Sequence, residues 1–139
     1  MYKYLDHTAD ILFVADAKTL EQIFCESALA VENAMVDISK VKAVQKQKIN
    51  VVGPNLELLL FKFLNDLLFY KDADQLMLSQ FKVKITQSNN RYALICLAQG
   101  EKLAIKRHKP KVDVKAITMH LLEIKESKAG WHAQAIIDI

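Results

Sequence analysis

The sequence predicts a single α+β domain in which a largely antiparallel β-sheet packs with two main α-helices. Three observations lead to this fold class. The chain has 139 residues, a length that suits one domain. Two segments carry apolar residues at helical spacing, and the segments around them alternate as strands do. The resulting order is strand, helix, strand, helix and then four strands, which favours antiparallel pairing. No linker or repeat divides the chain, so we expect residues 1–139 to form one domain.

The first helix is predicted to run from Thr19 to about residue 34, after a strand over residues 11–16. Thr19 and Gln22 have the spacing of a capping box, in which two side chains bond the free N–H groups at a helix start. Apolar side chains then recur on one helical face. They are Leu20, Ile23, Phe24, Ala28, Val31 and Ala34.

The second helix is predicted to open at Gly53-Pro54, because proline suits the first helical position. Its main apolar stripe is Leu56, Leu60, Phe63, Leu64, Leu67 and Leu68, and the stripe is widened by Leu58, Leu59, Phe61 and Phe69. A helix that is apolar on nearly all sides must be covered on most of its faces. We therefore expect it to be the central helix of the domain.

The remaining segments alternate between apolar and polar residues as half-buried strands do. Phe81, Val83 and Ile85, for example, alternate with two lysines and a threonine. Asparagine tolerates left-handed backbone angles, so Ser88-Asn89-Asn90 is expected to form a turn. The predicted strands cover residues 44–52, 81–86, 92–97, 112–125 and, after Gly130, 131–138.

Composition indicates a compact cytoplasmic protein. Hydrophobic residues make up 52% and charged residues 25% of the chain, a globular rather than a disordered balance. No run of eighteen apolar residues suggests a membrane span, and the N-terminal residues lack the apolar core of a signal peptide. Cys25 and Cys96 lie far apart in apolar stretches, so we expect buried free thiols in a reducing compartment.

One segment is rich in positive charge, although the net charge is only +3. Its basic residues are Lys102, Lys106, Arg107, Lys109 and Lys111, with His108 among them and Glu101 as the single acid. Such a run could contact RNA phosphates or an acidic protein surface. No aromatic residue is interleaved for base stacking, and a solvated loop is the favoured interpretation.

Familiar catalytic signatures are missing from the sequence. Three glycines leave no phosphate-binding loop, and no Gly-x-Ser-x-Gly elbow occurs. The four histidines, His7, His108, His120 and His132, have no pairing typical of a zinc site. The chain offers oxygen ligands but no obvious nucleophile.

Carboxylates at the two ends of the chain suggest a metal site. Asp138 and the α-carboxylate of Ile139 are adjacent, and Asp10 would join them if the last strand lay beside the segment that carries it. Carboxylates that converge either share protons or hold a cation. The alternative is that Asp10 caps a turn and Asp138 is a solvated residue of a fraying terminus.

Five blocks, in order along the whole chain, resemble the archease family. They are His7-Thr8-Ala9-Asp10-Ile11; Leu64-Asn65-Asp66-Leu67-Leu68; Gly100-Glu101 with His108; Val114-Lys115-Ala116-Ile117-Thr118 with His120; and Asp138-Ile139. The resemblance implies a small α+β protein that serves as a cofactor of the GTP-dependent RNA ligase RtcB, which splices tRNA. Such a protein helps the ligase to acquire its guanylate and to turn over repeatedly, and it does not itself join RNA.

The resemblance also implies a divalent-metal site, commonly filled by calcium. Its ligands would be Asp10, Asp138 and the carboxylate of Ile139, so the metal interpretation becomes the favoured one. Lys115 matches a functionally important lysine of the family, and His7 and His120 are candidate supporting residues. Without the resemblance, Lys115 would be taken as a solvated strand residue.

The sequence departs from the family pattern in two places. Met119 stands where tyrosine is usual, and Lys102-Leu103-Ala104-Ile105 stand where proline or aspartate is usual. These changes leave the expected metal ligands intact and put a role of the second segment in doubt. A general chaperone or a metal-binding interaction module without a ligase partner is the alternative function. A metal-dependent hydrolase is less favoured, because no histidine or lysine is obviously paired as a base.

Overall fold

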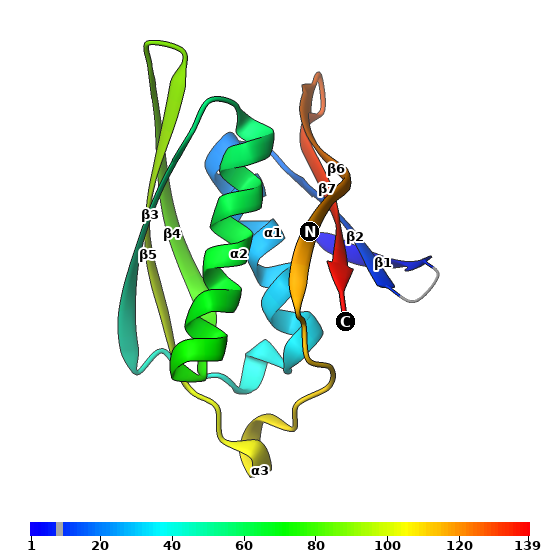
Figure 1. Ribbon diagram of the computed structural model, residues 1–139, viewed down its shortest axis with the longest axis vertical. Helices are drawn as coiled ribbons and strands as arrows, with labels where there is room; N and C mark the ends of the chain where they lie inside the picture. Colours follow the sequence, from blue (N-terminus) through cyan, green and yellow to red (C-terminus); the bar gives the residue numbers. More distant parts are fainter. Residues whose placement is uncertain (8–9) are drawn as a thin grey trace.

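The computed structural model describes residues 1–7 and 10–139, and for Asp6 and His7 it describes the backbone alone. The two long helices lie in the first half of the described chain, separated by β3, and strands dominate the second half (Figure 1). The elements are β1 Tyr2–His7, β2 Asp10–Ala17, α1 Leu20–Met35, η1 Ile38–Lys40, β3 Gln45–Gly53, α2 Leu56–Asp74, β4 Leu76–Ser88, β5 Arg91–Lys102, α3 Ile105–His108, β6 Ala116–Ser127 and β7 Gly130–Asp138.

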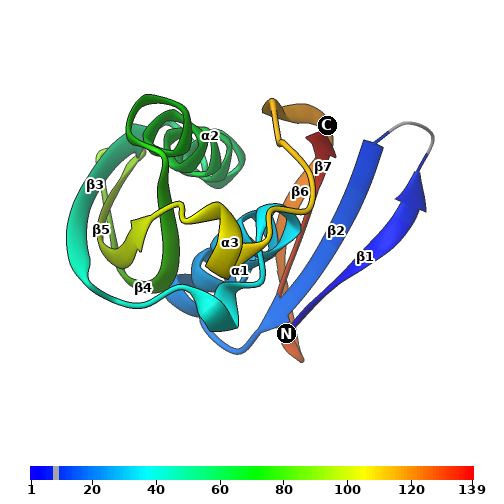
Figure 2. The ribbon, with the colours of Figure 1, turned by 90° about the horizontal axis from the view of Figure 1, so that it is seen from below.

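The strands form two antiparallel sheets, with the two long helices between them (Figure 2). One sheet has the order β1-β2-β7-β6 and the other β3-β5-β4. Helix α1 packs against β2 and β4, and α2 packs against β3 and β6, so each helix contacts both sheets. The predicted α+β class is confirmed. The difference is that two sheets cover the helices on opposite sides, where the sequence suggested one sheet.

Helix α2 is central, as predicted, and its buried side chains join one hydrophobic core with α1 and both sheets. These side chains are Leu59, Leu60, Phe63, Leu64, Leu67 and Leu68. The ring of Phe63 packs against Phe24 of α1 and Phe81 of β4, with centroids 6.0 and 6.4 Å away. Phe69 departs from the expected coverage, because its side chain is 61% exposed. No helix in the described residues is both long and apolar enough to cross a membrane.

Helix α1 begins as predicted, whereas α2 begins two residues later than predicted. The Thr19 hydroxyl accepts a hydrogen bond from the Gln22 N–H at 3.2 Å. In α2 the first cap is Asn55, whose side-chain oxygen accepts from the Leu58 N–H at 2.8 Å. Pro54 therefore precedes the cap and does not occupy the first helical position, because the asparagine amide already satisfies a free N–H of the first turn.

Most predicted strands are confirmed, and the prediction for residues 112–125 is wrong at its start. Strand β6 begins at Ala116, because the preceding segment is bonded to α1 through the Lys111 N–H and the Met35 carbonyl, 2.7 Å apart. The predicted turn at Asn89 and Asn90 has positive φ angles of 48° and 61°. Strand β1 and the short helix α3 were not predicted.

Both cysteines are free thiols, in agreement with the prediction. Cys96 is buried and Cys25 is half-buried. Burial raises the pKa of Cys96 to about 12, so its thiol is protonated at neutral pH.

Candidate metal centre

Strand pairing brings Asp10 and Asp138 together. Asp10 is the first residue of β2, Asp138 is the last of β7, and the two are direct partners in the antiparallel register. Residues that face each other in this way lie on one face of the sheet with Cβ atoms about 5 Å apart. The C-terminus lies beside the end of β2 that carries Asp10 (Figure 2). Ile139, which follows, is 37% exposed, so its carboxylate is within reach of solvent ions.

Asp138 is held from both sides. Its strand β7 lies between β2 and β6, with Asp10 as one partner and Ala116 as the other. Its carbonyl oxygen also accepts a hydrogen bond from the Lys115 N–H at 2.8 Å. Asp138 is therefore held in a strand ladder and does not fray, and Asp10 is its partner in that ladder.

The two aspartates alone offer too few oxygen ligands for a hard cation such as calcium. In the described residues no three His, Cys, Asp or Glu side chains gather as a metal site would require. Two aspartates would need the terminal carboxylate and water to complete the six to eight oxygen ligands that calcium takes. Carboxylate oxygens are the ligands calcium prefers, so the residues present fit it better than they fit zinc.

Thr118 places a buried polar group near the aspartate pair. Its hydroxyl oxygen is buried and finds no hydrogen-bond partner among the described residues. Thr118 is the β6 partner of Ile136, two residues before Asp138, so it lies on the same sheet face, about 7 Å along the strand. Buried hydroxyls without a partner are rare and suit a bound water. Thr118 stands in one of the blocks that resemble the family, but its role as a candidate neighbour of the site was not predicted.

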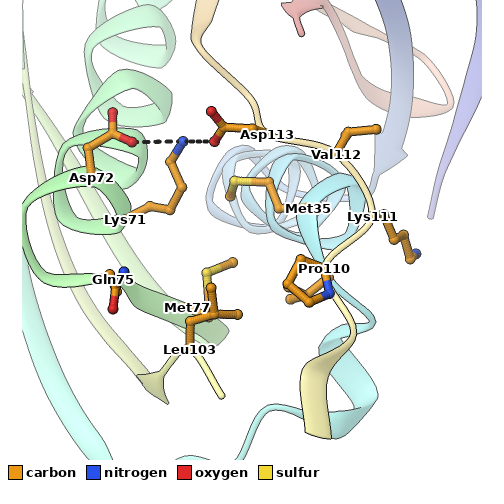
Figure 3. A pocket seen from close by; sticks show the side chains of 11 residues that line it. Met35, Lys71, Asp72, Gln75, Met77, Leu103, Pro110, Lys111, Val112 and Asp113 are labelled. Carbon is orange, nitrogen blue, oxygen red and sulfur yellow. Dashed lines mark hydrogen bonds and ion pairs between the residues drawn. The ribbon is translucent and has the colours of Figure 1, made fainter. Parts of the chain in front are cut away.

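Lys115 is exposed, and the backbone around it is anchored to α2. The ammonium of Lys71 donates to the Val114 carbonyl at 2.6 Å and to an Asp113 carboxylate oxygen at 2.8 Å. Figure 3 shows Lys71 between Asp72 and Asp113. Burial opposes the charge of Lys71, but its bonds to the two carboxylates outweigh burial and raise its pKa. This ion pair fixes the segment that leads into Lys115.

Asn65 of α2 provides a second anchor. Its side-chain oxygen accepts from the Ile117 N–H at 3.1 Å, and its amide nitrogen lies 3.4 Å from the Ile117 carbonyl oxygen. Because β6 is an edge strand, Asn65 bonds backbone groups that no neighbouring strand satisfies. This explains the asparagine in the Leu64–Leu68 block, which helps to place β6 beside Asp138.

Two hollows lie on either side of the segment that contains Lys111 and Val112. Both residues line both hollows. One, shown in Figure 3, has a volume of about 330 Å³ between α2 and this segment. The other, of about 420 Å³, includes Asp10, Tyr4 and Ile11 in its lining. The surface beside Asp10 is therefore concave, whereas Asp138 lines neither hollow.

The two candidate supporting histidines are not shown to join this site. The side chain of His7, together with Thr8 and Ala9, lies outside the described residues. His120 is exposed in a bulge of β6, where residues 119–122 stand opposite Ala135 alone and Leu121 has a φ of 60°. Among the described residues it forms no hydrogen bond through its side chain, and the register does not pair it with Asp138.

The basic segment is more ordered than a solvated loop. It contains one helical turn, α3, and His108 is fully buried. Glu101 accepts hydrogen bonds from the Lys42 N–H at 2.8 Å and from His108 Nε2 at 2.9 Å, and it pairs with Arg107. These contacts, led by the Lys42 N–H, lower the pKa of Glu101 to about 2. The expectation of solvation is right for Lys102, Lys106, Lys109 and Lys111, which are exposed. The expectation of a loop is wrong for Lys102, which ends β5, and for residues 105–108, which form α3 and include the buried His108.

Comparisons with known proteins agree with this architecture. The profile of the Archease protein family (MTH1598/TM1083) matches residues 2–139. The chain is 40% identical to the protein archease of Pyrococcus furiosus, with 99% of this chain and 98% of the relative covered. It is 38% identical to the protein archease of Methanosarcina barkeri, with 99% and 95% covered.

Solved structures show the same fold. The solution structure of Methanobacterium thermoautotrophicum protein 1598 superposes with a TM-score of 0.88 at 33% identity, covering 99% of this chain and 98% of that one. The crystal structure of an archease described as a possible chaperone, from Thermotoga maritima, gives a TM-score of 0.54 at 18% identity, covering 100% and 98%. The chain described here belongs to the archease family.

Proposed function

We propose that this protein is a non-catalytic activator of a GTP-dependent RNA ligase of the RtcB type, working in the cytoplasm in tRNA splicing or RNA repair. It promotes guanylylation of the ligase and repeated turnover. Membership of the archease family supports this proposal. The observation that carries the site is the register that pairs Asp10 with Asp138 beside the C-terminus.

In this proposal Asp10, Asp138 and the carboxylate of Ile139 hold a divalent cation, calcium in the first instance. Bound there, the cation would offset two of the three negative charges, and the coordination positions left to water would accept an oxygen of an anionic group of the ligase complex. Lys115 is anchored next to Asp138 through its own N–H, so its ammonium adds a positive charge at the same edge. The cation and the ammonium suit contact with phosphate groups or with acidic side chains.

The histidine–carboxylate pairs of the described residues do not support a hydrolase with a side-chain nucleophile. His132 Nδ1 lies 3.1 Å from Asp16, but its other ring nitrogen faces Gln134 at 3.5 Å and no hydroxyl or thiol. His108 is enclosed between Glu101 and the Ala104 N–H. Neither ring contacts a nucleophile, as a nucleophilic mechanism would require.

The test is guanylylation of the ligase from the same organism, with GTP, calcium and substoichiometric amounts of this protein. We expect the protein alone to consume no GTP and to join no RNA, and the mixture to guanylylate faster and turn over more often. Lys115→Ala should fold normally, because exposed substitutions usually change stability by about 0.5 kcal/mol or less. It should nonetheless stimulate poorly, and Asp10→Ala should stimulate less still. A matched exposed variant, Lys128→Ala, should behave as wild type.

A ligase that runs equally fast without the protein would refute the activator proposal. Equal stimulation by Lys115→Ala, Asp10→Ala and wild type would refute the assigned residues. The general-chaperone alternative predicts something different, namely suppression of aggregation of unrelated unfolded proteins. Light scattering of such a protein during heating, with and without this one, measures that activity directly.

A further inference from the structure

The sheet formed by β3, β5 and β4 leaves one whole face to solvent, because α1 and α2 cover only the other (Figures 1 and 2). Alternate residues of each strand point away from the helices, and the exposed residues identify that outer set. Its charged members are Lys46, Lys48, Lys82, Lys84 and Arg91. Their five positive charges exceed the net charge of the whole chain, +3.

No negative charge balances this face. Strands β3 and β4 contain no acidic residue, and the single acid of β5, Glu101, is buried and bonded elsewhere. None of the five cations forms an ion pair with another described residue. The outer face is therefore a continuous positive surface.

The register arranges the lysines in two rows with an apolar ridge between them. Leu97 of the middle strand faces Lys48 on one side and Lys82 on the other. The next outward residue, Ile95, faces Asn50 and Lys84. Because neighbouring strands lie about 4.8 Å apart, the two rows are about 10 Å apart. The ridge is open to solvent, with Ile95 52% and Leu97 39% exposed.

Lysines on edge strands discourage edge-to-edge pairing with other chains, and β3 and β4 are both edges. That role explains the charges but not the ridge, since the middle strand could carry polar residues there. An apolar centre with a charged rim is the usual anatomy of a protein–protein interface. The face carries no aromatic side chain for base stacking, which disfavours single-stranded RNA as its occupant.

We propose that this face binds an amphipathic, acidic α-helix of a partner protein. A helix is about 10–12 Å across, which matches the gap between the lysine rows. Its apolar stripe would lie on Leu97 and Ile95, whose spacing of about 7 Å is close to the 6 Å rise of four helical residues. Aspartate and glutamate on both sides of the stripe would meet the two rows of lysines.

The surface is separate from the candidate metal centre, which belongs to the other sheet. The test uses a synthetic eighteen-residue helical peptide with a leucine stripe flanked by glutamates, labelled for fluorescence anisotropy and titrated with the full chain. A peptide with lysines in place of the glutamates is the control ligand. We expect saturable binding of the acidic peptide alone, and an unchanged calcium response of the protein.

The variant Lys48→Glu/Lys82→Glu should weaken peptide binding at least tenfold, and Leu97→Ser should weaken it by a similar factor. Lys18→Glu/Lys128→Glu makes the same change of net charge on exposed residues outside this sheet and should bind as wild type. Circular dichroism and melting temperature establish that each variant is folded. If Leu97→Ser proves unfolded, Ile95→Ser serves the same purpose.

Binding that is equal in the two charge variants would overturn the proposal. So would tight binding of a labelled single-stranded RNA that Leu97→Ser leaves unchanged, which would make the face a phosphate-binding surface. Because the peptide assay contains no ligase, its outcome is independent of the activator function proposed above.

Discussion

At the scale of single residues, the candidate metal centre depends on strand register. A shift of one residue between β2 and β7 would put the Asp10 and Asp138 side chains on opposite faces of the sheet. Pairs on the core side, such as the buried Phe13 with Ala135 and the half-buried Ile11 with the buried Ile137, oppose such a shift. The core therefore determines where the two carboxylates meet.

Replacing Asp138 should remove the thermal response to calcium. A ligand that binds only the folded protein stabilises it by RT ln(1 + [L]/Kd), about 2.7 kcal/mol at a hundredfold excess over Kd. We expect Asp138→Asn to lose most of that gain in a melting experiment, and Asp74→Asn, an exposed residue at the end of α2, to keep it. An equal rise in melting temperature for all three proteins would exclude Asp138 as a ligand.

A second residue of note is Glu32 of α1, which is buried in the core. One carboxylate oxygen accepts from the Leu78 N–H at 2.7 Å, and the other has no partner among the described residues. Burial raises the pKa of Glu32 to about 8, although the Leu78 N–H and the charge of Lys71 favour ionisation. At neutral pH this side chain is therefore largely protonated.

The raised pKa of Glu32 predicts how stability changes with pH. Between about pH 4.5 and 8 the folded state keeps a proton that the unfolded state has lost, so Glu32 makes stability fall as pH rises. Above pH 8 both states are ionised and its effect levels off. In urea titrations at pH 5, 6.5 and 8, the free energy of unfolding of wild type should decline relative to Glu32→Gln. A constant difference between the two proteins across this range would contradict the assignment.

Neither the burial of Glu32 nor the unpartnered hydroxyl of Thr118 could have been identified from the sequence. Both stand among apolar neighbours in segments that read as ordinary helix or strand, and their burial depends on residues far away in the chain. Asp10 and Asp138 could be proposed, because carboxylates at the two ends of the chain are conspicuous. The register that brings these two residues together could not be predicted, since it depends on which strands pair.

At the scale of elements, periodicity predicted the segments better than their ends. The capping of α1 by Thr19 is local and was correct. The predicted start of β6 was wrong. The Lys71 ammonium bonds the Val114 carbonyl and the Lys111 N–H bonds the Met35 carbonyl, and these contacts keep residues 112–115 out of the sheet. Strand β1 was missed because it is short and lies at a sheet edge, where a strand forms without a clear alternation of apolar and polar residues.

Helix α3 is the element that depends most on polar contacts. It spans four residues, so its own hydrogen bonds do not stabilise it, and Glu101 links it to the segment after η1 through Arg107, His108 and the Lys42 N–H. These contacts lower the pKa of Glu101, so they contribute stability above about pH 4.5. That contribution is lost as the pH falls towards 2.

Glu101→Gln should therefore loosen α3 before the rest of the fold. Removing one partner of a buried hydrogen-bonded group costs about 1–3 kcal/mol. We expect faster amide exchange of residues 102–109 and quicker tryptic cleavage after Lys106 or Arg107, with exchange in α2 little changed. Lys102→Gln, on the exposed side of the same segment, is the control. Protection of α3 equal to that of wild type would show that packing alone holds it.

At the scale of the whole molecule, the two ends of the chain lie at opposite ends of β2 (Figure 2). The Met1 carbonyl accepts a hydrogen bond from the Asp16 N–H at 2.9 Å, whereas Asp138 pairs with Asp10. Six residues of extended strand separate Asp10 from Asp16, about 20 Å. This geometry arises because the strands form two sheets around the helices. Which strands pair depends on contacts between distant parts of the chain, so local sequence patterns could not predict it.

This separation predicts that tags at the two termini have unequal effects. An extension after Ile139 converts its carboxylate into an amide and adds bulk next to Asp10 and Asp138, so it should weaken calcium binding. The same number of residues added before Met1 disturbs an exposed ammonium that pairs with Glu26 at 2.9 Å and donates to the Asp16 carbonyl at 3.0 Å, far from Asp10 and Asp138. Calorimetric titration with calcium should give a markedly weaker affinity for the C-terminally tagged protein, and the wild-type value should return after cleavage back to Ile139. Equal affinities for the two tagged forms would mean that the terminal carboxylate is not a ligand and that Asp10, Asp138 and water must supply the coordination alone.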